Sequence, residues 1–240
     1  MGPTIIYKDE FLVAVHKPSG WLAIPDRFDA NLPSVKSWLS SQGVTPFVIH
    51  RIDKDTSGLI LFALDAESHK YYNQLFEQRE VEKKYLGLVH GSMPETKGTY
   101  NLPIEEHPAK AGCMRIGKKG KPSITHYQVI KSYRGYSWVS FHIETGRTHQ
   151  IRVHLQSSGN YLACDPLYGE PSPILLSSFK KKFNLSRNEL EERPLLSRLA
   201  LHASSIACID RMGKPIFIEA PLAKDLEVTL KQMDKWSKSA

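Results

Sequence analysis

The most constraining feature of this sequence is an apolar run that directly follows a charged segment. The run at residues 59–64 reads "LILFAL", and an uninterrupted apolar run of this length predicts a buried strand. Before it, "HRIDKDTSG" at residues 50–58 holds two acidic and two basic side chains. A charge beside a core costs free energy unless it is paired. We therefore expect one of these groups to be held there for chemistry.

The rest of the chain mixes strand and helix signals without regular alternation. Turn residues and apolar periodicity predict strands in hairpins at residues 4–20 and 124–146, and single strands near 58–65, 83–91, 199–208 and 215–220. They predict helices at residues 34–43, 66–80 and 147–159 and from about Leu222 onward. In the second helix Tyr71, Leu75 and Phe76 form the expected apolar stripe.

This order does not fit a doubly wound fold, in which strands and helices alternate. We expect an α+β fold with a largely antiparallel sheet. The whole chain, residues 1–240, is predicted to form a single domain. Residues 94–123 are predicted as loops and short edge strands, and residues 171–194 as a partly helical surface excursion.

Composition narrows the class of protein. A net charge of +7 favours a polyanionic partner, above all a nucleic acid. No apolar run approaches the length of a membrane span, and the N-terminus does not resemble a signal peptide. The three cysteines lie far apart, which indicates neither a disulfide framework nor a thiolate zinc site. We expect a cytoplasmic protein without a structural metal.

Three segments combine an apolar context with polar groups that could act together. They contain Asp53, Tyr85 and Arg152. A carboxylate near a core needs a cationic partner, and a guanidinium fits it best. A carboxylate paired in this way stays ionised and can act as a nucleophile or base, while a tyrosine offers a flat face to a base. A purely structural aspartate–arginine pair remains an alternative, and so does an aspartyl-phosphate phosphatase with Asp53 as its nucleophile.

The same segments resemble the signature motifs of the RluA-type pseudouridine synthases. "DEFLVAVHKPSGWLAIP" resembles the opening motif, and "HRIDKDTSGLILFAL" the HRLD-x-x-TSG motif, with Ile52 in place of leucine. "KKYLGLVHG" resembles the K-x-Y strand, and "LALHA" a late strand of the family. "TGRTHQIRVHL" with "GNYLACDPLYG" resembles the TGR-x-HQ-[IL]-R-x-H motif and its GDPLYG continuation, with Cys164 in place of glycine.

The resemblance implies roles for individual residues. Asp53 would be the nucleophile, attacking the ribose or the uracil ring. Tyr85 would stack on the uracil and help to move the proton from ring carbon five, and Arg152 would form the ion pair with Asp53. Arg51 would fill the gap that the flipped uridine leaves in the RNA.

The remaining substrate-binding residues that the resemblance implies are Ile151, which would pack against the base, and His50, Thr56 and Arg147. It implies the family's catalytic fold, a bent, mixed and mainly antiparallel sheet with flanking helices. It implies no metal and no organic cofactor. The motifs begin almost at Met1, so we expect a short member without the S4-type RNA-binding domain, and a monomer. Its RNA would be rRNA, tRNA or both. An inert RNA chaperone on the same fold is the alternative function.

Overall fold

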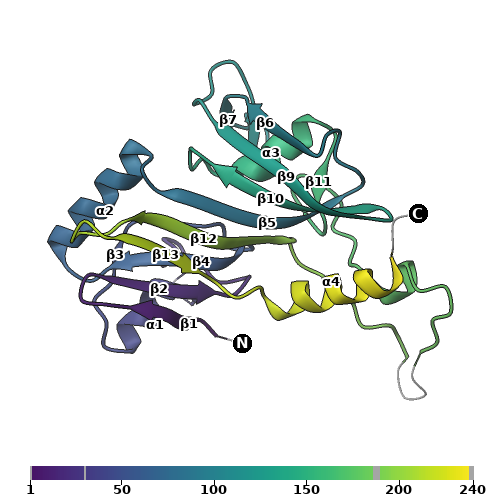
Figure 1. Cartoon of the computed structure of the whole chain (residues 1–240), viewed down its shortest axis with the longest axis horizontal. Coiled ribbons are helices and arrows are strands. Elements are labelled where there is room, and N and C mark those ends of the chain that lie inside the picture. The colour runs from purple at the N-terminus through teal and green to yellow at the C-terminus, as the bar shows by residue number, and fades with distance from the viewer. Residues whose placement is uncertain (1, 30, 186–189, 238–240) are drawn as a thin grey trace. The chain divides into compact units, whose positions relative to one another are not determined.

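A hairpin of two antiparallel strands begins the computed structural model (Figure 1). Strands β1 (Thr4–Lys8) and β2 (Leu12–Lys17) pair as the sequence predicts. The carboxylate of Asp9 accepts hydrogen bonds from the backbone amides of Phe11 at 2.8 Å and Leu12 at 2.7 Å. An aspartate that bonds to the backbone two and three residues ahead fixes the geometry of its turn, and so it sets the start of β2.

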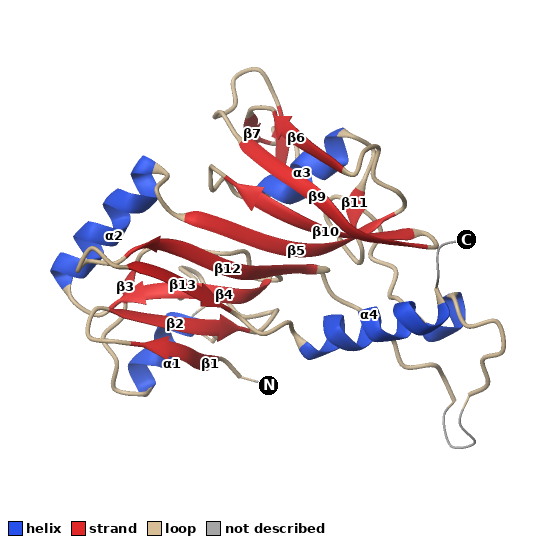
Figure 2. Ribbon diagram, in the orientation of Figure 1, coloured by secondary structure: helices blue, strands red, loops and turns tan. Residues whose placement is uncertain are grey.

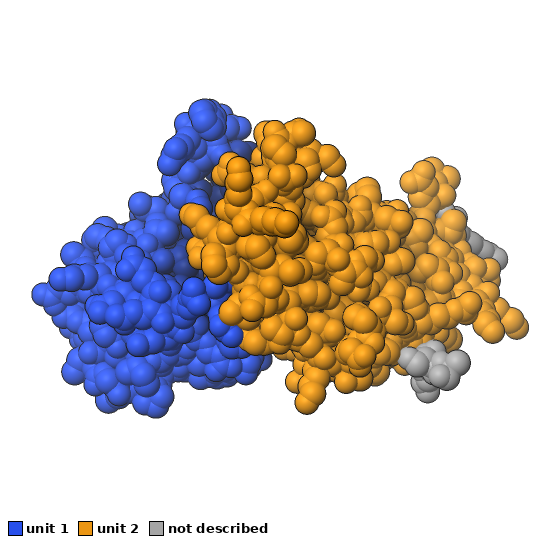
Figure 3. Space-filling model, turned by 90° about the horizontal axis from the view of Figure 1, so that it is seen from above, with its two compact units in different colours: residues 1–85, 142–145, 202–221 blue, residues 86–141, 146–201, 222–240 orange. Residues whose placement is uncertain are grey.

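The structure describes residues 2–29, 31–185 and 190–237, and these form two units (Figure 3). The first unit comprises residues 1–85, 142–145 and 202–221, and the second comprises residues 86–141, 146–201 and 222–240. Neither unit is one continuous stretch of chain. The single catalytic domain over residues 1–240 therefore stays a prediction.

The first unit is a sheet with helices packed against it (Figure 2). Its further elements are α1 (Val35–Ser41), β3 (Phe47–Val48), β4 (Ser57–Ala63), α2 (Ala66–Gln78), β12 (Leu201–Ile209, without its first residue) and β13 (Pro215–Glu219). The strand order is β1-β2-β4-β12, with β3 beside β4 and β13 beside β12. The pair β4–β12 is parallel, whereas β1–β2, β2–β4, β3–β4 and β12–β13 are antiparallel.

Strand β4 is buried along its whole length, as its apolar run predicts. Leu59 packs in one cluster with Tyr72 of α2, whereas Ile60 and Phe62 pack in another with Leu39 of α1. Side chains alternate across a strand, so a strand between two apolar clusters has no face left for polar residues. Each large aliphatic or aromatic side chain buried here contributes about 1.5–3 kcal/mol.

The predicted stripe of α2 packs against the core, with Tyr71 and Phe76 half-buried there, but the prediction omitted Tyr72. The residues buried on this helix are Ser68, Tyr72 and Leu75, which follow the spacing i, i+4, i+7, and Tyr72 is completely inaccessible. Tyr71 is only half-buried, and its hydroxyl donates a hydrogen bond to the backbone carbonyl of Asp210 at 3.0 Å. Both tyrosines contact the same apolar cluster, and Tyr72 is the more deeply buried of the two.

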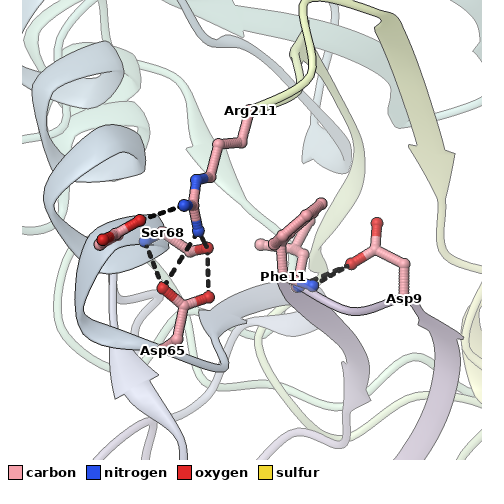
Figure 4. Close-up of polar contacts among 7 residues, drawn as sticks. Asp9, Phe11, Asp65, Ser68 and Arg211 are labelled. Atoms are coloured by element: carbon pink, nitrogen blue, oxygen red, sulfur yellow. Dashed lines mark hydrogen bonds and ion pairs between the residues drawn. The ribbon is translucent and has the colours of Figure 1, made fainter.

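Arg211 joins the β12–β13 turn to the start of α2 (Figure 4). Asp65 caps this helix by accepting from the amide of Ser68 at 2.8 Å, and Arg211 donates to both Asp65 and Ser68. The guanidinium also pairs with Glu67 and lies 5.1 Å from the centre of the Phe11 ring. Hydrogen bonds from Ser68, and the charge of Arg211, lower the pKa of the Asp65 carboxyl. The capping carboxylate is therefore ionised, as a helix N-terminus favours.

The second unit also combines a sheet with helices. Its elements are β5 (Glu82–His90, which begins in the first unit), β6 (Lys97–Asn101), β7 (Ile104–Glu106), β8 (Met114–Ile116), β9 (Ile124–Tyr133), β10 (Tyr136–Ile143, which ends in the first unit), α3 (Gln150–Ser157), β11 (Tyr161–Leu162), a 3-10 turn η1 (Leu176–Ser178) and α4 (Lys224–Trp236). The order β5-β10-β9-β6 has β11 beside β5, and β7 and β8 form a separate pair. The α+β class and its mainly antiparallel sheet are confirmed.

Most predicted boundaries in the second unit hold, with two shifts. Helix α3 begins at Gln150 and not at Arg147, because the Gln150 side chain accepts a hydrogen bond from the Arg147 amide at 3.0 Å and closes a turn there. Helix α4 begins at Lys224, two residues after the predicted start. Among the described residues of 171–194, the helical content is the single turn η1, and residues 186–189 lie outside the description.

None of the helices in the described ranges has both the length and the apolar character that crossing a membrane requires.

Candidate active site

Asp53 lies on the loop that connects β3 to β4 in the first unit. The backbone amide of Thr56 donates to the Asp53 carbonyl at 3.2 Å and closes a turn that begins at Asp53. Ile52 and Thr56 are buried, Asp53 is half-buried and Arg51 is exposed. The predicted arrangement is therefore present locally: the loop has a buried residue on either side, the carboxylate between them and a cation in solvent.

The side chain of Lys17 holds this loop in place through hydrogen bonds. Its side chain is completely buried, and its ammonium donates to the carbonyls of Pro18 at 3.2 Å, Trp21 at 2.7 Å and Lys54 at 2.7 Å. An ammonium has three donors, and three carbonyl acceptors satisfy them. The "KPSGW" segment therefore holds the backbone next to Asp53 through a charge-assisted hydrogen bond, the stronger kind.

Two further bonds from the same segment reach the loop. The amide of Gly20 donates to the Lys54 carbonyl at 2.9 Å, and the hydroxyl of Ser19 donates to the Asp55 carbonyl at 2.7 Å. The backbone carbonyls of both residues that follow Asp53 are thus bonded to residues 17–21. This contact links two motifs that lie more than thirty residues apart in the sequence.

His50 anchors the beginning of the loop. Its Nε2 accepts a hydrogen bond from the Leu61 amide at 3.0 Å, and its ring stacks on Phe76 with centroids 4.8 Å apart. Burial, assisted by the charge of Lys83, lowers the pKa of His50 to about 3. The neutral imidazole positions the loop through this nitrogen, and its predicted contact with substrate stays a prediction.

Gly58 explains the end of the "TSG" motif. A Cβ at this position would lie 2.1 Å from the carbonyl oxygen of Ala203, and the residue has a φ of +110°. Only glycine permits both the close approach of β12 and this backbone conformation. Beside it, the hydroxyl of Ser57 lies 3.0 Å from Nδ1 of His202, so side chains also join the parallel strands β4 and β12.

Tyr85 lies in the same unit as Asp53 and responds to its charge. Burial raises the pKa of the Tyr85 phenol far above its usual value, and the Asp53 carboxylate raises this pKa further. The phenol is therefore protonated at neutral pH. Two of the three predicted catalytic residues thus belong to one electrostatic environment.

Arg152 lies in the second unit and pairs with a residue that the sequence analysis missed. Its Nε and Nη2 donate to the two carboxylate oxygens of Asp165 at 2.9 and 2.7 Å, and the two side chains are 2% and 0% exposed. The amides of Leu167 and Tyr168 also donate to Asp165. The signal was present in "CDPLYG", where an aspartate precedes a turn. The predicted pairing of Arg152 with Asp53 stays a prediction.

The remaining predicted residues of the second unit surround the start of α3. Ile151 is buried, and Nε of Arg147 is buried without a hydrogen-bond partner among the described residues. His149 has a φ of +54°, and its Nδ1 lies 2.8 Å from the Tyr168 hydroxyl. A non-glycine residue in the left-handed region is strained, and such residues cluster at functional sites.

In the described part of the chain, no cluster of three or more histidine, cysteine or acidic side chains has a geometry that could hold a metal ion.

Known proteins resemble this chain in sequence and in fold. A family model described as RNA pseudouridylate synthase matches residues 11–157. Ribosomal large subunit pseudouridine synthase D of Nitrosomonas europaea is 33% identical over 232 residues, which cover 94% of this chain and 64% of that protein. The protein of the same name from Buchnera aphidicola subsp. Schizaphis graminum is 35% identical over 236 residues, which cover 96% and 73%.

A solved structure, human RNA pseudouridylate synthase domain containing 1, superimposes with a TM-score of 0.72 at 24% identity, covering 99% of this chain and 89% of that one. The fold is thus of the pseudouridine synthase type. The family model spans more than half of the chain, and relatives exceed 30% identity along nearly all of it. The chain belongs to the RNA pseudouridylate synthase family, and the predicted resemblance to its RluA-type members is confirmed.

Proposed function

We propose that this protein converts uridine to pseudouridine in RNA, with Asp53 as the nucleophile. The observation that carries the proposal is the fixed Asp53 loop, whose carboxylate acts electrostatically on Tyr85, in a chain of this family. The relatives named above are longer than this chain, which spans 64% and 73% of their length. The activity is therefore argued from this chain's own residues.

The reaction is an isomerisation that needs no oxidant and no cofactor. The bond from ribose C1′ to uracil N1 breaks, a bond from C1′ to C5 forms, and the proton on C5 is exchanged for one on N1. Asp53 would hold the reacting group covalently, either at C1′ or on the ring, while the base turns. Nucleophilic catalysis of this kind replaces one difficult step by two easier ones.

Tyr85 would supply a neutral aromatic face to the flipped base. Because burial and the Asp53 carboxylate both raise its pKa, the phenolate is scarce at neutral pH. Proton removal from C5 by Tyr85 would therefore require that the phenol lose its own proton at the same time. We assign stacking to Tyr85 as its principal role.

The three arginines would have different roles, one at the nucleophile and two toward the RNA. Arg152 would stabilise the ionised carboxylate of Asp53, with Asp165 holding the guanidinium in a fixed orientation. The buried Nε of Arg147 would donate to the substrate, which accounts for its lack of a partner among the described residues. Arg51, exposed on the loop, would enter the RNA stack where the uridine has left it.

The substrate that we propose is structured RNA, with large-subunit rRNA as the first candidate. Two relatives carry that RNA in their names, and a net charge of +7 suits any polyanion. Mapping pseudouridines in rRNA and tRNA from cells with and without this protein would identify the modified RNA. Loss of a site in tRNA alone would exclude rRNA as the substrate.

The proposed nucleophile is tested by Asp53→Asn. This change keeps the size of the side chain and removes the carboxylate, so we expect unchanged folding and RNA binding but no pseudouridine. Tritium release from RNA labelled at uracil carbon five measures turnover directly. Near-normal turnover by the variant would remove Asp53 from the chemistry.

A further inference from the structure

The last residue of α4, Trp236, is a large aromatic side chain with 40% of its surface exposed. The ammonium of Lys235 lies 4.9 Å from the centre of its ring, and that of Lys180 lies 5.1 Å from it. All three residues belong to the second unit. None of them has a role in the catalytic chemistry proposed above, and an exposed tryptophan beside two cations calls for an explanation.

Lys180 is held near Trp236 by the core of the second unit. Its neighbour Phe179 packs against the cluster that contains Leu226 and Met233 of α4. At the base of the same excursion, the amide of Ile174 donates to the Leu196 carbonyl at 2.7 Å. The excursion is therefore fixed where it carries Lys180, and the cation belongs to the same surface as the ring.

The charge of this surface is positive. Lys180 is the first of three consecutive lysines. One carboxylate of the excursion, that of Glu192, accepts a hydrogen bond from the Ser177 amide at 2.9 Å, so the lysines still outnumber it. The acidic neighbour on α4 is Asp234, and its Oδ1 accepts from Lys131 at 2.6 Å and from the Tyr133 hydroxyl at 2.7 Å. Because Lys131 neutralises Asp234, the charges of Lys180 and Lys235 remain available to an anion.

We propose that Trp236, Lys180 and Lys235 form a second RNA-binding site, at which the indole stacks on an unpaired base and the lysines contact the adjoining phosphates. An aromatic face between cations matches the two parts of a single-stranded nucleotide. An exposed cation–π contact is weaker than base stacking on an aromatic ring. An incoming base therefore displaces a lysine, which then pairs with phosphate. The site rests on the proposed function in that RNA is the ligand.

Binding of a labelled single-stranded oligouridylate tests the site, measured by fluorescence anisotropy with the Asp53→Asn protein so that no turnover occurs. Trp236→Ala should weaken binding about tenfold, which is within the range for loss of one stacked base. Trp236→Phe keeps a stacking ring and should lose less than about threefold. Lys180→Gln and Lys235→Gln should each reduce the slope of log affinity against log salt by about 0.7.

Lys224→Gln is the matched control, because it removes one exposed charge from the same helix at a residue that already pairs with Glu227. It should change the slope less than either Lys180→Gln or Lys235→Gln. Equal affinities of Trp236→Ala and the parent protein, or equal slopes for all three lysine variants, would overturn the site.

Pseudouridine formation by the otherwise wild-type Trp236→Ala protein separates the two proposals: we expect a raised KM and an unchanged kcat. A wild-type protein that binds through Trp236 but forms no pseudouridine would contradict only the proposed function.

Discussion

At the scale of single residues, the buried pair of Arg152 and Asp165 is the interaction with the largest expected effect. Both side chains are almost inaccessible, and the contact is bidentate. Removing one partner of such a pair leaves a buried charge without compensation, which costs about 3–5 kcal/mol. We expect Arg152→Met to lower the free energy of unfolding by that amount, measured in urea.

A double variant controls for this result. Arg152→Met combined with Asp165→Leu removes both charges and should recover part of the stability. If the double variant is as unstable as the sum of the single changes, the pair is not coupled. A separate double variant tests the predicted contact of Arg152 with Asp53. If the two side chains are in contact, the effects of Asp53→Asn and Arg152→Met on the free energy of unfolding should not be additive.

His50 makes stability depend on pH. Its pKa is about 3 in the folded protein and 6.5 in an unfolded chain, so the unfolded state takes up the proton first. Stability is therefore lost as the pH falls below about 6.5 toward 3, at no more than about 1.4 kcal/mol per pH unit. His50→Asn should remove this component. Unfolding in urea at pH 7 and pH 5 should show a smaller decrease for the variant than for the wild type, and an equal decrease would contradict the assignment.

At the scale of elements, the contact between β4 and β12 depends on one glycine. Gly58→Ala would place a methyl group against the Ala203 carbonyl, 2.1 Å away, in a conformation that alanine disfavours. The strands must separate, and we expect a loss of at least about 3 kcal/mol, since overpacking and backbone strain add. Gly135→Ala is the matched control: its φ is +80°, but nothing lies within 4 Å of the new methyl group.

In the control, the free energy of unfolding should fall only by the strain of alanine in a left-handed conformation, on the order of 1 kcal/mol. Thermal unfolding of the two variants measures the difference. Equal losses would show that the close approach of β12 contributes nothing beyond backbone strain.

At the scale of the whole molecule, net charge predicts how the proposed RNA binding should depend on salt. A net charge of +7 predicts affinity that falls with salt, because phosphate contacts release counterions. Lys118, Lys119 and Lys121 are exposed around a turn between β8 and a bridge to Ile104. We expect replacement of all three by glutamine to reduce the slope of log affinity against log salt by about 0.7–0.9 per lost contact. An unchanged slope would exclude this turn from the RNA contact and leave the catalytic assignment intact.

The sequence by itself determined the family, the α+β class and most of the elements. Those signals are local: apolar periodicity, turn residues, and motifs in which Asp53 and Tyr85 stand at fixed positions. It also located the Asp53 loop, because charged residues next to a buried apolar run cost free energy unless they are paired. It could not distinguish Tyr71 from Tyr72 in α2, since both fit a helical stripe.

Only the tertiary structure decided which distant groups meet. Asp165 as the partner of Arg152, and the carbonyls that surround Lys17, depend on chain segments brought together by folding. The same holds for Ala203 against Gly58 and for Lys180 beside Trp236. Periodicity specifies which side chains share a face of one element. The pairing of elements depends on packing across the whole core, and that energy is spread over many contacts that no short segment encodes.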